Sequence, residues 1–332
     1  MRHDTTRRNV LKRAATLSLS AMASALPEAD ALPGPRPQQS APDFFPGFRR
    51  GTHKTSAGVT INYVTGGSGP GLLLLHGYPQ THIMWRKIAP KLSQKFTVVA
   101  PDLRGYGDSD KPPEGENHAG YSKRAMAHDP VEVMASLGFQ RFAVVGHDRG
   151  ARVAHRMAID HADRVTKLVV LDIVPTYKVF QSVNQKIATA SFHWFFLIQK
   201  PPIPETMLAR SVELWLKKVW FEGLLPDVID SQAYAEYLRC FRDPAMIHST
   251  CEDYRAGASI DLEHDKADLD HKISCPVLVL WGSRGHQPLF YDTVAVWRER
   301  ALDVSGRVIP SGHFIAEENP QALLAELKPF LS

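Results

Sequence analysis

The chain has 332 residues, of which 44% are hydrophobic and 22% are charged, and its formal net charge is +4. This length and composition are typical of a globular protein with one large domain or two modest ones. The small net charge and the lack of lysine and arginine blocks argue against a polyanionic ligand, so we expect no nucleic-acid partner.

The first 31 residues differ in composition from the rest of the chain. They carry T-R-R-N-V-L-K with paired Arg7 and Arg8, then a short apolar run and small residues. This pattern resembles a twin-arginine export signal, which predicts a periplasmic protein with cleavage near Ala25 or Ala31. The apolar run is too short and too polar to span a bilayer, so we expect no stable membrane insertion. Residues 32–43, rich in proline and alanine, predict a linker.

From residue 44 onward, strand patterns alternate with helical ones. An alternating segment at 59–64 is followed by short, continuous apolar runs at 71–77, 96–102, 142–148, 167–174 and 276–282. Such runs are typical of strands buried on both faces of a parallel sheet. Helical patterns at 83–95, 121–137 and 149–161 lie between them, and Pro130 predicts a kink or break in the second. The alternation predicts an α/β fold with a mostly parallel, doubly wound sheet.

Residues 175–262 interrupt this alternation. They contain no buried-strand run, and their aromatic, amphipathic stretches predict a helical cap inserted after the sixth strand of the core. The core then comprises residues 44–174 and 263–332, with the cap over the carboxyl edge of the sheet, where open α/β sheets bind ligands. The segment 261–272 carries two histidines among many carboxylates; we interpret it as an acidic, solvated helix, and we expect no metal.

The segment V-V-G-H-D-R-G-A-R at 144–152 has the frame of a nucleophile elbow, with Asp148 at the position that serine usually occupies. Gly146 and Gly150 on either side permit the close packing of a sharp strand-to-helix turn. A carboxylate held above the sheet in this way can attack a saturated carbon and form an ester.

Hydrolysis of that ester requires a general base, and the segment I-P-S-G-H-F supplies His313. The loop after 276–282 has no carboxylate, so we assign Asp172, which follows the strand before the cap, to orient His313. The segment H-G-Y-P after the run at 71–77 predicts an oxyanion hole made by the backbone N–H groups of Tyr78 and Arg149.

Arg149 and Arg152 lie three residues apart at the start of the helix that follows the elbow, so they share one helix face beside the nucleophile. Two guanidinium groups at a helix N-terminus form a strong site for a carboxylate. The pair therefore predicts a small anionic substrate.

Several motifs together make the chain resemble the fluoroacetate (haloacetate) dehalogenases of the α/β-hydrolase superfamily, from about residue 44 to the C-terminus. These motifs are H-G-Y-P-Q-T-H-I-M-W, P-D-L-R-G-Y-G-D-S-D-K-P, G-H-D-R-G-A-R, L-D-I-V-P-T-Y, H-W-F-F, C-E-D-Y-R-A-G-A and S-G-H-F. The resemblance implies that Asp148 displaces halide with inversion and that His193, Trp194 and Tyr254 hold the leaving halide. It also implies a homodimer and no metal or organic cofactor.

Two other functions remain open from the sequence. An epoxide hydrolase would use the same aspartate and histidine, but it would need a pair of cap tyrosines and commonly has its acid after the later strand. A carboxylate-binding protein without activity would need only the arginines. The presence of nucleophile, base, acid and oxyanion loop together favours an enzyme over simple binding.

Overall fold

The computed structural model describes residues 43–332, so the expected export signal and all but the last residue of the expected linker lie outside the described residues. None of the helices in residues 43–332 has the length and apolar character that a bilayer crossing needs.

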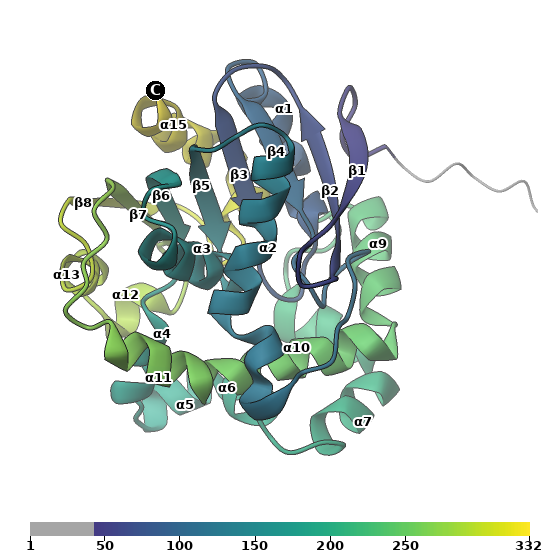
Figure 1. The fold of residues 1–332 in the computed structure, drawn as a ribbon. Helices are drawn as coiled ribbons and strands as arrows, with labels where there is room; N and C mark the ends of the chain where they lie inside the picture. Colours follow the sequence, from purple (N-terminus) through teal and green to yellow (C-terminus); the bar gives the residue numbers. More distant parts are fainter. Residues whose placement is uncertain (1–42) are drawn as a thin grey trace, which may run out of the picture. The chain divides into compact units, whose positions relative to one another are not determined.

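Residues 43–332 contain one eight-stranded sheet with the order β1-β2-β4-β3-β5-β6-β7-β8 (Figure 1). The first pairings, β1 with β2 and β2 with β4, are antiparallel, and all pairings from β4 to β8 are parallel. The strands are β1 (Arg49–Lys54), β2 (Thr60–Gly66), β3 (Gly71–Leu75), β4 (Thr97–Pro101), β5 (Phe142–His147), β6 (Val165–Leu171), β7 (Val277–Gly282) and β8 (Val304–Ile309). The predicted α/β fold with a mostly parallel sheet is confirmed.

The parallel strands at the centre of the sheet are buried along their whole length. Every residue of β3 and β5 is buried, which explains why these strands appear in the sequence as uninterrupted apolar runs. The edge strand β1 was not predicted, because its sequence R-R-G-T-H-K is polar and it has no buried residue. An edge strand with one partner needs no apolar run, so hydrophobic patterning does not reveal it.

The helices of the core connect and cover the strands. They are η1 (His82–Lys87), α1 (Ala89–Leu92), η2 (Glu116–Tyr121), α2 (Lys123–Ser136), α3 (Arg149–Asp160), α12 (Gln287–Phe290), α13 (Thr293–Arg298), α14 (Ile315–Glu318) and α15 (Pro320–Leu331). The helix predicted at 83–95 is two short helices, η1 and α1.

Helix α2 passes through Pro130 without the expected break. Proline removes one intrahelical hydrogen bond at this point. The helix buries Met126, Val133 and Met134 on both sides of the proline, and this burial holds the chain in helical form despite the missing bond.

The cap follows β6, as predicted. Its helices are α4 (Thr176–Gln181), α5 (Gln185–Ala190), α6 (Phe192–Leu197), α7 (Ile203–Arg210), α8 (Val212–Leu214), η3 (Trp215–Trp220), α9 (Ser231–Phe241), α10 (Pro244–Gly257) and α11 (Ile260–Ala267). Helix α11 begins before residue 262 and ends after it. In Figure 1, α5, α6, α7, α10 and α11 gather at one end of the sheet.

Five neighbouring parallel strands, β3, β5, β6, β7 and β8, end at the same edge of the sheet. The loops that follow four of them begin or contain the residues that the sequence analysis singled out: His76 to Tyr78 after β3, Asp148 after β5, Asp172 after β6 and His313 after β8. The topology alone therefore brings these residues to one place beneath the cap.

Candidate active site

Asp148 occupies the sharp turn between β5 and α3. Its backbone has φ 47° and ψ −115°, a conformation that residues other than glycine rarely adopt. Such a conformation costs about 1–3 kcal/mol and persists only where the surrounding structure imposes it. Here the turn lifts a buried carboxylate above the sheet, where it borders a cavity.

Asp148, His313 and Asp172 come together from the ends of three strands. His313 Nδ1 lies 2.6 Å from Asp172 Oδ2, and His313 Nε2 lies 4.0 Å from Asp148 Oδ2. The other oxygen of Asp172 accepts a hydrogen bond from the Gly282 N–H at 3.0 Å. Since a carboxylate can only accept, Nδ1 of His313 carries a proton, and in the neutral imidazole Nε2 is the free base that faces Asp148.

The surroundings shift the pKa values of both His313 and Asp148. Burial opposes a proton on His313, but the hydrogen bond and charge of Asp172, together with the charge of Asp148, raise the pKa of His313 above its ordinary value. Burial also opposes a charge on Asp148, but the positive charges of His313, His147, Arg149 and Arg152 hold its pKa below the usual value. Asp148 is therefore ionised at neutral pH.

The loop after β3 brings a backbone donor to the carboxylate of Asp148. The Tyr78 N–H donates to Asp148 Oδ1 at 3.0 Å, whereas Oδ2 accepts no hydrogen bond from any described residue. Glycine is required at position 77, because a Cβ there would lie 2.6 Å from the Cβ of Asp148. On the other side of the Gly77–Tyr78 peptide, His76 Nδ1 lies 3.0 Å from the Gly77 carbonyl oxygen.

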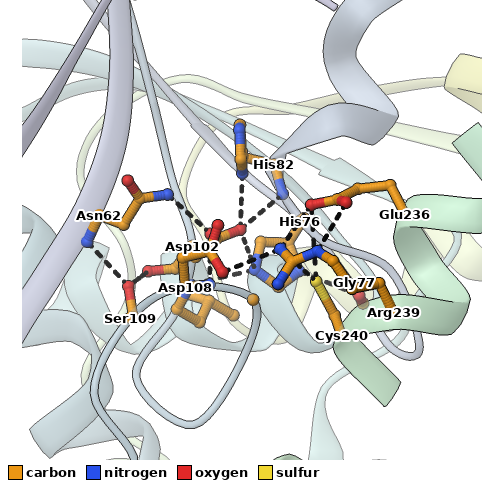
Figure 2. A network of polar contacts seen from close by, with 12 residues as sticks. Asn62, His76, Gly77, His82, Asp102, Asp108, Ser109, Glu236, Arg239 and Cys240 are labelled. Carbon is orange, nitrogen blue, oxygen red and sulfur yellow. Dashed lines mark hydrogen bonds and ion pairs between the residues drawn. The ribbon is translucent and has the colours of Figure 1, made fainter. Parts of the chain in front are cut away.

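A buried polar network supports this loop (Figure 2). His76 Nε2 accepts the Leu103 N–H at 3.0 Å, so Nδ1 carries the proton that is donated to the Gly77 carbonyl. Beside it, Asp102 accepts hydrogen bonds from His82 Nδ1 at 2.8 Å and from the His82 N–H at 2.9 Å. Burial would raise the pKa of Asp102, but His82 and His76 hold it well below the usual range. The network fixes the peptide whose N–H contacts Asp148.

Arg149 is completely buried, and most of its guanidinium is already engaged. Its Nε and Nη2 donate to the carboxylate of Asp253, at 3.0 and 2.8 Å, and Nη2 also donates to the Asp253 carbonyl. The same carboxylate binds Lys123 Nζ and accepts the hydroxyl of Tyr106 at 2.6 Å. Only Nη1 of Arg149 is left without a hydrogen-bond partner among the described residues.

Sequence reasoning missed Asp253. It lies within C-E-D-Y-R-A-G-A, directly before Tyr254, but no local pattern shows that its partner is Arg149, which precedes it by 104 residues. Through Arg149, Asp253 connects cap helix α10 to the first turn of α3, and its charge compensates one of the two arginines.

Arg152 differs from Arg149 because no described carboxylate forms an ion pair with it. Its Nη1 donates to the Val174 carbonyl and to Thr176 Oγ1, both at 3.0 Å, and its Nε has no partner among the described residues. Burial and the neighbouring Arg149 lower the pKa of Arg152 to about 10, so the group remains charged at neutral pH. A buried guanidinium without a carboxylate partner can bind an anion.

The three residues expected to hold a halide lie close together. The ring of Tyr254 is 5.9 Å from the rings of both His193 and Trp194. The Tyr254 hydroxyl is buried and has no hydrogen-bond partner among the described residues. Burial lowers the pKa of His193 to about 3, so this imidazole is neutral and still has one N–H to donate.

A cavity of about 240 Å³ joins these groups. Asp148, Arg152, Asp172, His193, Trp194 and His313 all line it, together with apolar side chains that come mostly from the cap. Residues 43–332 contain no group of three histidine, cysteine, aspartate or glutamate side chains that could hold a metal ion. The cavity thus brings together an ionised carboxylate, a histidine–aspartate pair and a cationic group, and a backbone donor contacts the carboxylate.

This fold and this arrangement of residues define a class of protein. Residues 70–320 match the family model for the α/β hydrolase fold, and the chain belongs to that family. Its members place nucleophile, acid and histidine at strand ends in this chain order. The protein is therefore a hydrolase.

Within the family, the resemblance to the fluoroacetate dehalogenases is confirmed. The chain is 45% identical to fluoroacetate dehalogenase from Burkholderia sp., over 87% of this chain and 95% of the relative. It is 36% identical to the soluble epoxide hydrolase of Corynebacterium sp., over 80% of this chain and 92% of the relative. A crystal structure from Nostoc sp., assigned to the α/β hydrolases, has 55% identity, covers 86% of this chain and 98% of its own, and superposes with a TM-score of 0.84.

Proposed function

We propose that the protein is a hydrolytic dehalogenase of short 2-haloacids, which converts a haloacetate and water to glycolate, halide and a proton. The observation that carries the proposal is Arg152, a buried cation that lines the same cavity as Asp148 and has no ion-pair partner among the described residues. A substrate carboxylate would supply the ion-pair partner of Arg152. The similarity to a fluoroacetate dehalogenase supports the same substrate class.

The substrate carboxylate would bind Arg152 and the remaining Nη1 of Arg149. Asp253 fixes the Arg149 guanidinium, so this donor needs little reorganisation when the substrate arrives. The bound carboxylate would hold the α-carbon of the substrate near Asp148, which borders the same cavity.

In the first step, Asp148 Oδ2 attacks the α-carbon from the side opposite the halogen. Oδ1 is held by the Tyr78 N–H, so Oδ2 is the oxygen free to react. A C–O bond forms, the carbon–halogen bond breaks with inversion, and the halide leaves with the bonding electron pair. The Tyr254 hydroxyl, which has no hydrogen-bond partner among the described residues, and the neutral His193 and Trp194 would donate hydrogen bonds to the halide.

In the second step, water hydrolyses the aspartyl ester. His313 Nε2 removes a proton from the water, which attacks Cγ of Asp148, and Asp172 stabilises the imidazolium that results. The Tyr78 N–H already contacts Oδ1, the oxygen that becomes negative in the tetrahedral intermediate, and the Arg149 N–H is the second donor proposed for it. Collapse of the intermediate releases glycolate, whose alkoxide oxygen takes the proton from His313, and the carboxylic acid left on Asp148 loses its remaining proton to water and is again a carboxylate.

The proposal is tested by measuring halide release from fluoroacetate and chloroacetate, with Asp148→Asn as the control. We expect release by the wild-type protein and none by D148N. A single turnover in H₂¹⁸O should place ¹⁸O in Asp148 and not in the first glycolate formed, because the glycolate oxygen comes from Oδ2. Chloride release without fluoride release would keep the reaction and reject carbon–fluorine cleavage. No halide from either acid would refute the proposal.

An epoxide hydrolase is the second candidate. It is supported by the similarity to the Corynebacterium enzyme and by the buried Tyr254 hydroxyl, which could protonate an epoxide oxygen. An uncharged epoxide, however, would leave the buried Arg152 without an ion-pair partner among the described residues. Diol formation from a terminal epoxide, without halide release from haloacetates, would favour this candidate.

A further inference from the structure

The loop that carries His313 lies between the end of β8 at Ile309 and the start of α14 at Ile315. His313 is the member of the site that must face Asp172 on one side and Asp148 on the other. A loop residue in this position needs fixed neighbours, because a shift of about 1 Å can cost two orders of magnitude in rate.

One carboxylate holds the backbone on both sides of His313. The Gly312 N–H donates to Glu318 Oε2 at 2.6 Å, and the Phe314 N–H donates to Glu318 Oε1 at 3.0 Å. The Glu318 side chain is only 6% exposed, so these bonds are shielded from water. A Cβ at position 312 would lie 2.8 Å from Glu318 Oε1, so only glycine allows the carboxylate to come this close.

The carbonyl group of His313 is held as well. His147 Nε2 lies 2.8 Å from the His313 carbonyl oxygen and donates to it, since a carbonyl only accepts. Burial lowers the pKa of His147 to about 4, so this imidazole stays neutral and its proton stays on Nε2. Because His147 precedes Asp148 in the chain, it ties the loop of the base to the turn of the nucleophile.

Glu318 also contributes charge. Its carboxylate is among the groups that raise the pKa of His313, after Asp172 and Asp148. Arg284, from the loop after β7, donates to Glu318 Oε2 at 2.8 Å and compensates part of this charge. The proposed reaction assigns no role to Glu318.

We propose that Glu318 is a positioning residue, which holds the imidazole of His313 where it contacts Asp172 and reaches the water that hydrolyses the ester. This inference rests on the proposed function. Glu318 touches neither substrate nor reacting atoms, so its loss should impair ester hydrolysis, which needs His313, and spare ester formation, which does not.

The test is Glu318→Gln, with Glu326→Gln as the matched control. The glutamine amide has one acceptor oxygen, so it can satisfy only one of the two backbone N–H groups. Glu326 lies on α15 and pairs with Arg307 at 3.4 Å, away from the site. With chloroacetate, E318Q should release the first equivalent of chloride at the wild-type rate and then turn over about tenfold more slowly or worse. Intact-protein mass spectrometry should show the alkylated enzyme accumulating in E318Q only.

A substrate-free measurement separates this inference from the proposed function. NMR titration of the His313 Cε1–H should give a lower pKa in E318Q than in E326Q. If the wild-type protein releases no halide, the proposed function fails, and this titration by itself decides whether Glu318 positions His313. An equal pKa of His313 in both variants overturns that role. If the wild-type protein is active, the positioning role of Glu318 is overturned when E318Q turns over as fast as E326Q and accumulates no alkylated enzyme. If E318Q does not fold, Glu318→Asp, which keeps the charge but is one methylene shorter, takes its place with the same expected accumulation.

Discussion

The two arginines next to Asp148 are alike in sequence but different in their surroundings. Asp253 neutralises Arg149 and holds it in place, whereas Arg152 lines the cavity as a cation whose only described hydrogen-bond acceptors are neutral oxygens. The cost of burying such an unpaired cation is a reason to expect that its partner arrives with the substrate.

Replacing Arg152 should therefore affect anionic substrates selectively. Hydrogen bonds to a charged group contribute about 1.5–3 kcal/mol, so we expect R152M to lower kcat/KM for chloroacetate by about 10- to 100-fold or more. The kcat/KM for chloroacetamide, which has no carboxylate, should fall much less. R152K keeps the charge but not the planar guanidinium, so its kcat/KM for chloroacetate should lie between those of the wild-type protein and R152M. Equal losses with both substrates would mean that Arg152 only supports the fold.

The pH dependence of turnover should report His313. The base works when neutral, so turnover should rise with pH through the pKa of His313 in the ester, which Asp172 raises by its hydrogen bond and its charge. In D172N this charge is lost, so the rise should move to lower pH while the plateau rate falls. Steady-state rates from pH 5 to 10 for both proteins test this. A profile that does not move in D172N would contradict the assigned pair.

At the scale of elements, the site depends on contacts between segments that are far apart in the sequence. The loops after β3 and β4 are joined by Asp102, His82 and His76, and this network holds the peptide that contacts Asp148 (Figure 2). Asp102 is almost fully buried, so its charge depends on these partners and on the hydrogen bonds that Asn62 Nδ2 and the Asp108 N–H donate to its Oδ2.

Asp102→Asn should destabilise the protein by about 3 kcal/mol, because breaking a buried charge network costs more than losing an exposed pair. The pKa of Asp102 is depressed in the folded state, so its contribution is complete above the unfolded value of about 4 and is lost as the pH falls through the folded value. The difference in unfolding free energy between wild type and D102N should therefore shrink below pH 4. Asp163→Asn, which alters an exposed pair with Arg164, should cost about 1 kcal/mol or less.

Most of the fold and of the catalytic residues could be predicted from the hydrophobic runs and from the residues that follow them. The six strand patterns correspond to β2 through β7, and the loops after β3, β5, β6 and β8 contain the predicted catalytic residues and Tyr78 of the predicted oxyanion hole. Buried parallel strands are visible in a sequence because both of their faces are apolar. Asp253, Glu318 and Asp102 were not predicted as parts of the site, because each acts through specific partners that no periodic pattern records. The edge strand β1 was missed for a different reason: it is polar and has no buried residue, so hydrophobic patterning does not reveal it.

At the scale of the whole molecule, cap and core meet through buried charges as well as apolar contacts. Arg86 in the core donates to Glu317, 2.6 Å away in α14, and to Asp230, 2.8 Å away at the start of cap helix α9. Tyr237 of the cap donates to the same Glu317 at 2.8 Å. This junction holds the cap over the carboxyl edge of the sheet.

The twin-arginine pattern predicts where this folded molecule functions. Receptors of this type export folded proteins, so we expect the chain to reach the periplasm with residues 1–25 or 1–31 removed. Changing Arg7 and Arg8 to lysine should retain the full-length chain in the cytoplasm at an unchanged total amount. Cell fractionation and N-terminal mass spectrometry in a bacterium with this pathway would check it. Equal periplasmic amounts of both proteins would refute the export prediction.

The 4.0 Å pair between His313 Nε2 and Asp148 Oδ2 has a consequence for the order of events in the proposed reaction. One of the charges that keep a proton on His313 belongs to the nucleophile itself. In the proposed reaction the aspartyl ester would carry no charge, so the pKa of His313 would fall when the ester forms, and a larger fraction of the imidazole would be neutral when it must act as a base. Once glycolate departs, the carboxylate regains its charge and the imidazole its proton affinity. The charge state of Asp148 would thus favour the neutral base after the first step of the proposed reaction and its protonated form after the second.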